Sequence, residues 1–194
     1  CNIGGSVTST GSTLKFMRSY LTGNFTHATD TTDCTVFQST IREKLTTKAQ
    51  RSWIGYNTIR HMQVHKGHAE IVGNVINGRN MWGFGLHILG ANTFANVRNN
   101  EIFNGTVSST YAQTNKVVGI WINSPANATI VNNYIHDWKN THSSYDAAND
   151  CYIGIHVVSP AGDVHILGNK IADCYGTNDS ASSGYHHSKS IVAP

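Results

Sequence analysis

The feature that most constrains this chain is a short motif that occurs five times between residues 53 and 173. Each copy has an apolar residue, two variable residues, Asn, one more variable residue and Ile. The copies span residues 54–59, 71–76, 97–102, 130–135 and 166–171, and they place Asn57, Asn74, Asn100, Asn133 and Asn169 at one shared position. Internal repetition of this kind defines the architecture before any single residue does.

A second motif, Gly followed by apolar residues at alternate positions, lies between the later copies. It occurs at 85–88, 119–122 and 154–157, and 14 or 15 residues separate each Gly from the following Asn. Both motifs alternate with the period of a strand that has one buried face, and the apolar spacing does not fit a helix. Short strands stacked one repeat on the next bury a continuous apolar column that no single repeat could bury alone.

The repeated Asn has a physical role in such a stack. Asn tolerates bends near the left-handed region, and its amide can bond to the turn backbone or to the Asn of the next repeat. The repeats resemble those of the right-handed parallel β-helix in the pectin-lyase-like superfamily over about residues 53–173. That resemblance implies an all-β solenoid with about five clear coils. Its functional content is broad, because the fold carries lyases, hydrolases, epimerases, phage tailspikes and non-catalytic surface proteins.

Residues outside the clear repeats extend the same interpretation. Ser19 and Ser39 occupy the Asn position of one or two degenerate N-terminal coils, although residues 42–51 also have helical propensity. We expect a single domain over 1–194, with a lead-in at 1–13 and a loop or tail at 175–194. The chain begins with Cys and ends on what resembles an unfinished strand, so we expect a segment of a longer protein.

The charge and composition of the chain limit the classes of molecule that it is expected to bind. The formal net charge is +3 and the basic residues are scattered, which disfavours nucleic acid and permits an acidic polysaccharide without requiring one. No apolar run approaches the ~20 residues that a membrane span needs. Four cysteines leave two alternatives open: disulfides that pair Cys1 with Cys34 and Cys151 with Cys174, or free thiols.

The inserts between repeats lengthen mainly at one corner, at about 77–84, 104–118 and 137–153, and loops at one corner of successive coils would wall a groove. Alternation then turns His87, Trp121 and His156 outward on adjacent coils, with Gln63 extending the row. An outward Trp exposes apolar surface, so we predict a substrate-binding row for sugar rings and hydroxyls. The alternative is that loops or a neighbouring subunit cover Trp121.

Carboxylates are the usual acids and bases of glycoside cleavage, and Asp137 and Asp173 share one repeat position. We name them as candidate catalytic residues, with hydrogen bonding of the turn backbone as the alternative role. The run His61, His65 and His68 spreads along a strand over a distance too long for one ion, so neither a metal nor another cofactor is expected.

These observations predict an extracellular or virion-surface protein that binds a polysaccharide or surface glycan, in the manner of a tailspike. Cleavage by a glycoside hydrolase or polysaccharide lyase mechanism is the accompanying expectation. The alternative is a non-catalytic structural β-helix that assembles into a fibre, a filament or a homotrimer.

Overall fold

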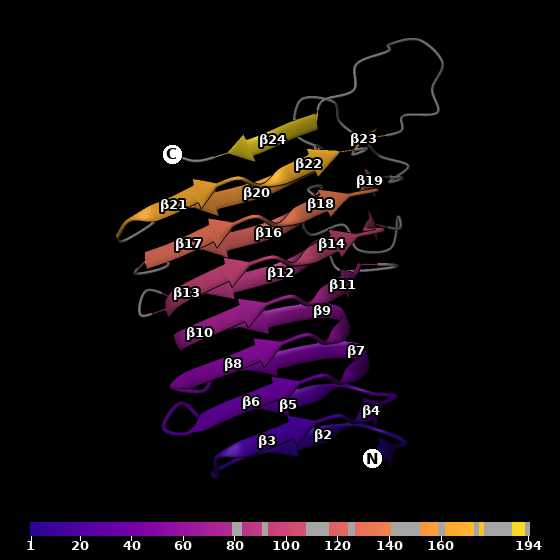
Figure 1. Ribbon diagram of the computed structural model, residues 1–194, viewed down its shortest axis with the longest axis vertical. Coiled ribbons are helices and arrows are strands. Elements are labelled where there is room, and N and C mark those ends of the chain that lie inside the picture. The colour runs from indigo at the N-terminus through magenta and orange to yellow at the C-terminus, as the bar shows by residue number, and fades with distance from the viewer. Residues whose placement is uncertain are drawn as a thin grey trace.

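The computed structural model describes residues 1–78, 83–90, 93–107, 117–123, 127–140, 152–158, 162–172, 175–176 and 188–192. Every helix or strand element in these ranges is a strand, and every strand pairing is parallel. The chain climbs along its long axis from the N-terminus to the C-terminus (Figure 1). The protein is therefore all-β, with parallel sheets that are compatible with a β-helix.

Successive strands contribute in turn to two large sheets. One sheet has seven strands, in the order β21 (Val164–Leu167), β17 (Asn127–Val131), β13 (Thr93–Arg98), β10 (Gly67–Val72), β8 (Arg51–Gly55), β6 (Asp33–Phe37) and β3 (Leu14–Met17). A small third sheet has the order β15 (Thr106–Val107), β19 (Lys139–Asn140) and β23 (Tyr175–Gly176).

The other large sheet has fourteen strands and two arms that meet on β7 and β9. In the first arm, Thr58 and Ile59 of β9 pair with β11, followed by β14, β18 and β22; in the second arm, Met62 to Val64 of β9 pair with β12, followed by β16, β20 and β24. The strands are β1 (Asn2–Ile3), β2 (Val7–Ser9), β4 (Tyr20–Leu21), β5 (Phe25–His27), β7 (Thr40–Thr47), β9 (Thr58–Val64), β11 (Val75–Asn77), β12 (Phe84–Leu89), β14 (Glu101–Phe103), β16 (Val117–Asn123), β18 (Tyr134–His136), β20 (Tyr152–Val158), β22 (Lys170–Ala172) and β24 (Ser188–Val192).

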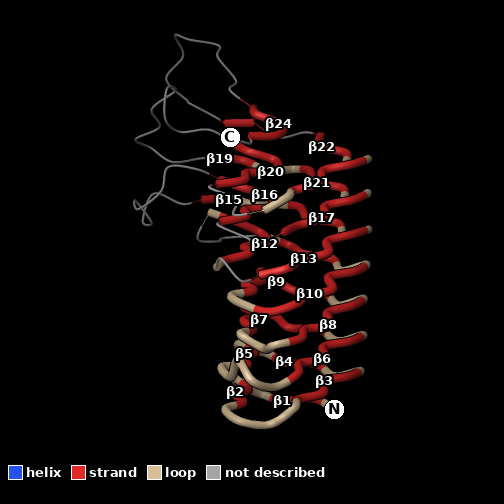
Figure 2. Tube along the Cα trace, turned by 90° about the vertical axis from the view of Figure 1, so that its left-hand side faces the viewer, coloured by secondary structure: helices blue, strands red, loops and turns tan. Residues whose placement is uncertain are grey.

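Three columns of five apolar side chains each lie in the core of the molecule. Figure 2 shows the stacked strands that carry them from the side. Strand register stacks like residues on one another, so that each column is buried along its length. The columns are Val36, Ile54, Ile71, Val97 and Ile130; Ile41, Ile59, Ile76, Ile102 and Ile135; and Leu45, Met62, Leu86, Ile120 and Ile155. Burial of such columns is the main stabilising term for a stack of short strands.

The repeated Asn residues form a hydrogen-bonded ladder. In each step, the backbone N–H and the Nδ2 amide of one Asn donate to the Oδ1 of the next, at 2.9–3.0 Å. Ser39 donates its N–H to Asn57, and Ser19 donates to Ser39, so both serines continue the ladder as predicted. The left-handed backbone expected at Asn belongs instead to the residue before it, for example Tyr56 (φ 55°) and Asn132 (φ 54°).

Two N-terminal segments, residues 1–13 and 42–51, contain strands where the sequence suggested a lead-in and a possible helix. Residues 42–47 belong to strand β7, residue 51 starts β8, and residues 48–50 connect the two, because Leu45 and Thr47 point into the core and β7 pairs with β5 and β9. Helical propensity is a weak preference that such tertiary pairing overrides. The lead-in at 1–13 contains β1 and β2, which pair with β4 and β5.

Candidate functional site

The four residues of the predicted binding row lie side by side on the second arm of the fourteen-stranded sheet. Gln63 of β9 is the register partner of His87 of β12, His87 is that of Trp121 of β16, and Trp121 is that of His156 of β20. Their chain neighbours at alternate positions are buried in the core. The geometry therefore brings these four residues together on the face opposite that core. We call them the ring row.

The expectation that the ring row is openly exposed is wrong for His87, which is only 8% exposed. Phe84, Val118 and Ile153 form a second apolar cluster that packs against Trp121, and Phe84 lies 4.7 Å from the His87 ring. Trp121 stacks on His87 at 4.7 Å and on His156 at 5.9 Å, with small interplanar angles. The faces of the Trp121 ring thus meet imidazoles, which disfavours sugar stacking on those faces.

Polar atoms of the ring row have unused hydrogen-bonding capacity. Within the described part of the chain, neither ring nitrogen of His87 nor Nε1 of Trp121 has a hydrogen-bond partner, although all three atoms are buried. Burial lowers the pKa of His87 to about 4, and the charge of nearby His65 acts in the same direction. His87 is therefore neutral near pH 7, with one nitrogen that donates and one that accepts.

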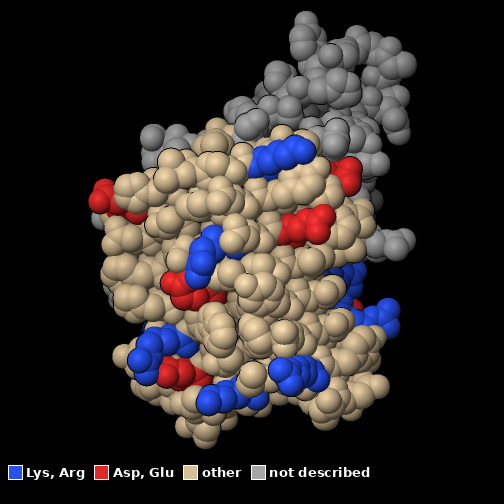
Figure 3. Space-filling model, in the orientation of Figure 1, with Lys and Arg blue, Asp and Glu red and all other residues tan. Residues whose placement is uncertain are grey.

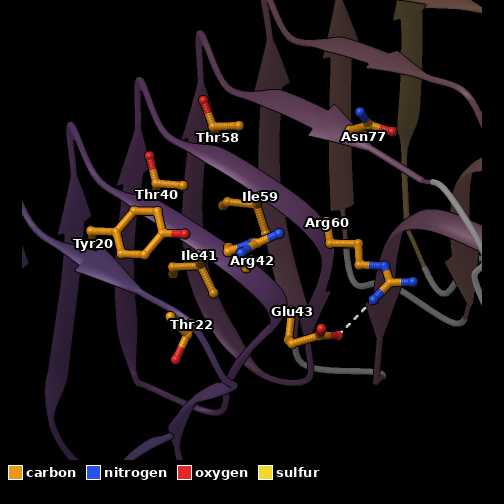
Figure 4. Close-up of a pocket in the computed structure, with 10 residues that line it drawn as sticks. All are labelled: Tyr20, Thr22, Thr40, Ile41, Arg42, Glu43, Thr58, Ile59, Arg60 and Asn77. Atoms are coloured by element: carbon orange, nitrogen blue, oxygen red, sulfur yellow. Dashed lines mark hydrogen bonds and ion pairs between the residues drawn. The ribbon is translucent and has the colours of Figure 1, made fainter. Parts of the chain in front are cut away.

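A groove of about 640 Å³ opens on the first arm of the same sheet (Figure 4). Tyr20, Thr40 and Thr58 follow one another on β4, β7 and β9, and Arg42, Arg60 and Asn77 also line the groove. Arg60 pairs with Glu43 at 2.8 Å. Strand β9 supplies Arg60 to the groove and Gln63 to the ring row, so the two features adjoin. The loop wall predicted at about 77–84, 104–118 and 137–153 lies largely outside the described residues.

Asp137 belongs to a cluster that the sequence did not reveal. Its carboxylate lies 2.8 Å from Nδ1 of His136, and Nε2 of His136 lies 3.1 Å from Glu101. The His136 ring stacks on Tyr134 at 4.1 Å and on Phe103 at 5.2 Å. Alternation around buried Ile135 turns Tyr134 and His136 outward, and that signal could have identified them.

The backbone at Asp137 supports its alternative role as a turn residue. Asp137 has φ 55°, and Asn104, at the same repeat position, has φ 60°. Asn and Asp are the side chains that tolerate this left-handed region best after Gly. The second candidate carboxylate, Asp173, lies outside the described residues, so its catalytic role beside Asp137 stays a prediction.

The described residues give no metal position and no disulfide. In the ranges that the structure covers, no group of three or more His, Cys, Asp or Glu side chains converges on one point, and this includes His61, His65 and His68. Cys1 is exposed and Cys34 is buried, both as free thiols, so the Cys1–Cys34 pairing is not formed. Cys151 and Cys174 fall outside the described residues. No described helix is long and apolar enough to cross a membrane.

No family model, curated protein or solved structure matches this chain.

Proposed function

We propose that the chain is a right-handed parallel β-helix, similar to the pectin-lyase-like superfamily, that binds a polysaccharide or surface glycan outside the cell or on a virion. The parallel register, the three apolar columns and the Asn ladder support this fold. The glycan would lie over the fourteen-stranded sheet, along the ring row and into the adjoining groove.

One observation carries the proposed ligand class: the buried nitrogens of His87 and Trp121 that have no partner in the described part of the chain. Leaving such groups unpaired costs about 1–3 kcal/mol each, so a ligand whose hydroxyls displace the covering side chains and reach these nitrogens recovers that free energy. A sugar hydroxyl both donates and accepts, which matches a neutral imidazole beside an indole N–H. The hydroxyls of Thr40 and Thr58 and the amide of Asn77 offer the same chemistry in the groove.

The sharpest test is His87→Phe. Phe keeps a flat ring for the stack on Trp121 but removes both nitrogens, so glycan binding should weaken by about tenfold or more while far-ultraviolet circular dichroism is unchanged. His165→Phe makes the same chemical change at an exposed residue of the other large sheet and should leave binding intact. Equal binding by the parent and His87→Phe across a glycan array would remove the proposal.

Trp121→Ala extends the test to the indole N–H. We expect weaker glycan binding with the strand content retained. Because Trp121 also packs against Phe84, Val118 and Ile153, its unfolding free energy must be measured beside its affinity.

Cleavage of the glycan is a second candidate function, favoured by the hydrogen-bonded group of Glu101, His136 and Asp137. A carboxylate next to an imidazole can exchange protons with a substrate oxygen. Asp137→Asn should lower turnover at least ~100-fold if Asp137 is the acid or base. Asn fits the left-handed backbone at this position, as Asn104 does, so the variant should fold. A variant as active as the parent would assign Asp137 to the turn.

A further inference from the structure

The outer face of the seven-stranded sheet carries an aromatic surface that the ring row does not include. Trp53 is 47% exposed, Tyr56 58% and Phe94 39%, and half-buried Phe37 lies next to the first two. Trp53 faces outward because its chain neighbours Ser52 and Ile54 point into the core. We call Phe37, Trp53, Tyr56 and Phe94 the outer aromatic surface. Exposed apolar surface of this kind commonly marks a binding site.

The rings of this surface are held in place. Phe37 stacks on Trp53 at 5.0 Å and meets Tyr56 edge-on at 5.6 Å. Glycines beneath two of the rings leave room for them: a Cβ at Gly73 would lie 2.7 Å from the Tyr56 ring, and one at Gly55 would lie 3.2 Å from the Phe37 ring. The aromatic side chains are thus ordered before any ligand arrives, which lowers the entropic cost of binding.

A hollow with both apolar and polar lining residues adjoins the rings. It has a volume of about 210 Å³, and it is lined by Phe94 and by the hydrogen-bonding side chains of His68, Glu70, Asn96, Asn127 and Thr129. Glu70 is the register partner of Trp53 on the next strand, so the hollow begins beside the indole. Phe94 stacks on His68 at 4.6 Å and lies two strands from Trp53, roughly 10 Å away across the sheet.

Two ion pairs lie beside this surface. Arg51 lies 2.7 Å from Asp33, and Arg98 lies 3.7 Å from Glu70. In the view of Figure 3, where the seven-stranded sheet faces the reader, some basic and acidic side chains lie next to each other and other basic side chains stand apart. These two ion pairs leave little net charge directly beside the aromatic rings, which gives little electrostatic attraction there to a strongly anionic or cationic partner.

We propose that the outer aromatic surface and its hollow bind a neutral polysaccharide. The C–H face of one sugar ring lies on Trp53, a further ring lies by Phe94, and the carboxylate of Glu70 and the amides of Asn96 and Asn127 bind hydroxyls between them. Aromatic walls with a few directed polar groups are the usual composition of a small-molecule site. This site lies on the sheet opposite the ring row and does not depend on it.

Trp53→Ala tests the proposal on the whole chain by calorimetric titration with neutral hexasaccharides built from glucose, mannose or xylose. At least one should bind the parent, and Trp53→Ala should weaken that binding about tenfold or more, as removal of an anchoring aromatic side chain does. Leu167→Ala, at a 61% exposed apolar residue on the far end of the same face, should bind as the parent does. His87→Phe should also retain this binding, which separates the two sites.

Three results would overturn the proposal. The first is that no neutral hexasaccharide binds the parent, and the second is that Trp53→Ala binds as tightly as the parent. The third comes from sedimentation: a parent that self-associates, with Trp53→Ala monomeric at the same concentration, would make this face a contact between copies. Circular dichroism of Trp53→Ala should match the parent, and the unfolding free energy is measured beside the affinity because the variant loses the stack on Phe37.

Discussion

Each Asn of the ladder satisfies several buried backbone and side-chain groups at once. Asn100, for example, donates from Nδ2 to the carbonyls of Ile71 and Arg98 and to Oδ1 of Asn133, and its own Oδ1 accepts from Asn74. The residue before each Asn turns the chain in the left-handed region, and the ladder holds that turn. One side chain therefore links three successive repeats.

Asn100→Ala should destabilise the protein by about 2–4 kcal/mol, because it leaves at least two buried polar groups without partners at ~1–3 kcal/mol each. Urea unfolding followed by circular dichroism measures the loss. Asn96→Ala, which removes an amide that reaches only the exposed Glu70, should stay within ~0.5 kcal/mol of the parent. Equal effects of the two substitutions would contradict the structural role of the ladder.

His61 and His87 make stability depend on pH. Burial lowers the pKa of His61 to about 3 and that of His87 to about 4, whereas both should titrate near 6.5 when unfolded. The unfolded state therefore binds more protons below pH 6.5. Stability should be complete above pH 6.5 and fall as the pH drops toward the folded pKa values, by up to about 1.4 kcal/mol per pH unit for each imidazole.

Unfolding free energies at pH 7, 6 and 5 check this dependence, since most carboxylates titrate below that range. The double variant His61→Phe/His87→Phe should show a smaller slope. A residual slope is expected from His27 and His65, whose pKa values burial also lowers. An unchanged slope in the double variant would show that other groups govern the acid sensitivity.

The strands of the second arm depend on glycine for close packing. A Cβ at Gly119 of β16 would lie 2.6 Å from Ile135 and 2.7 Å from the carbonyl of Gly154, and one at Gly85 of β12 would lie 2.6 Å from Ile102. The fully buried Trp138 also approaches Gly85, and its indole donates to the carbonyl of Ile102 at 3.1 Å. The Gly motif of the sequence thus marks the strands that rest directly on the Ile column.

Gly119→Ala should cost about 1–3 kcal/mol, the usual penalty for forcing an extra methyl into a packed core. Thermal and urea unfolding measure this cost. Gly4→Ala is the matched control, because a Cβ there meets nothing within 4 Å, and it should be neutral or slightly stabilising. A fully stable Gly119→Ala protein would mean that β16 can move away from Ile135.

The regular part of the molecule could be predicted from the sequence because one rule, alternation, repeats along it. Alternation placed Leu86, Ile120 and Ile155 inside, and equal spacing placed His87, Trp121 and His156 in register, as the structure confirms. Ser19 and Ser39 joined the ladder for the same reason.

The features that could not be predicted lie where the chain turns between strands, because inside–outside alternation gives no information there. The burial of His87 follows from Phe84, Val118 and Ile153, which pack together only after the strands are stacked. Trp138 follows the left-handed turn at Asp137. The inside–outside alternation of β18 does not continue through that turn, so the burial of Trp138 could not be predicted from the alternation. The turn residues before the Ser and Asn residues of the ladder include Arg18, Gln38 and Tyr56, which carry no turn signal of their own.

The buried thiol of Cys34 can report how often the N-terminal strands open. Its thiol is 1% exposed, and burial raises its pKa to about 12, so a thiol reagent should find almost no thiolate while β6 stays paired with β3 and β8. With Cys1, Cys151 and Cys174 replaced by Ser, the labelling rate of Cys34 would count how often the N-terminal strands separate. If Cys34 were labelled as fast as a cysteine in a free peptide, these strands would open much more often than their tight packing implies.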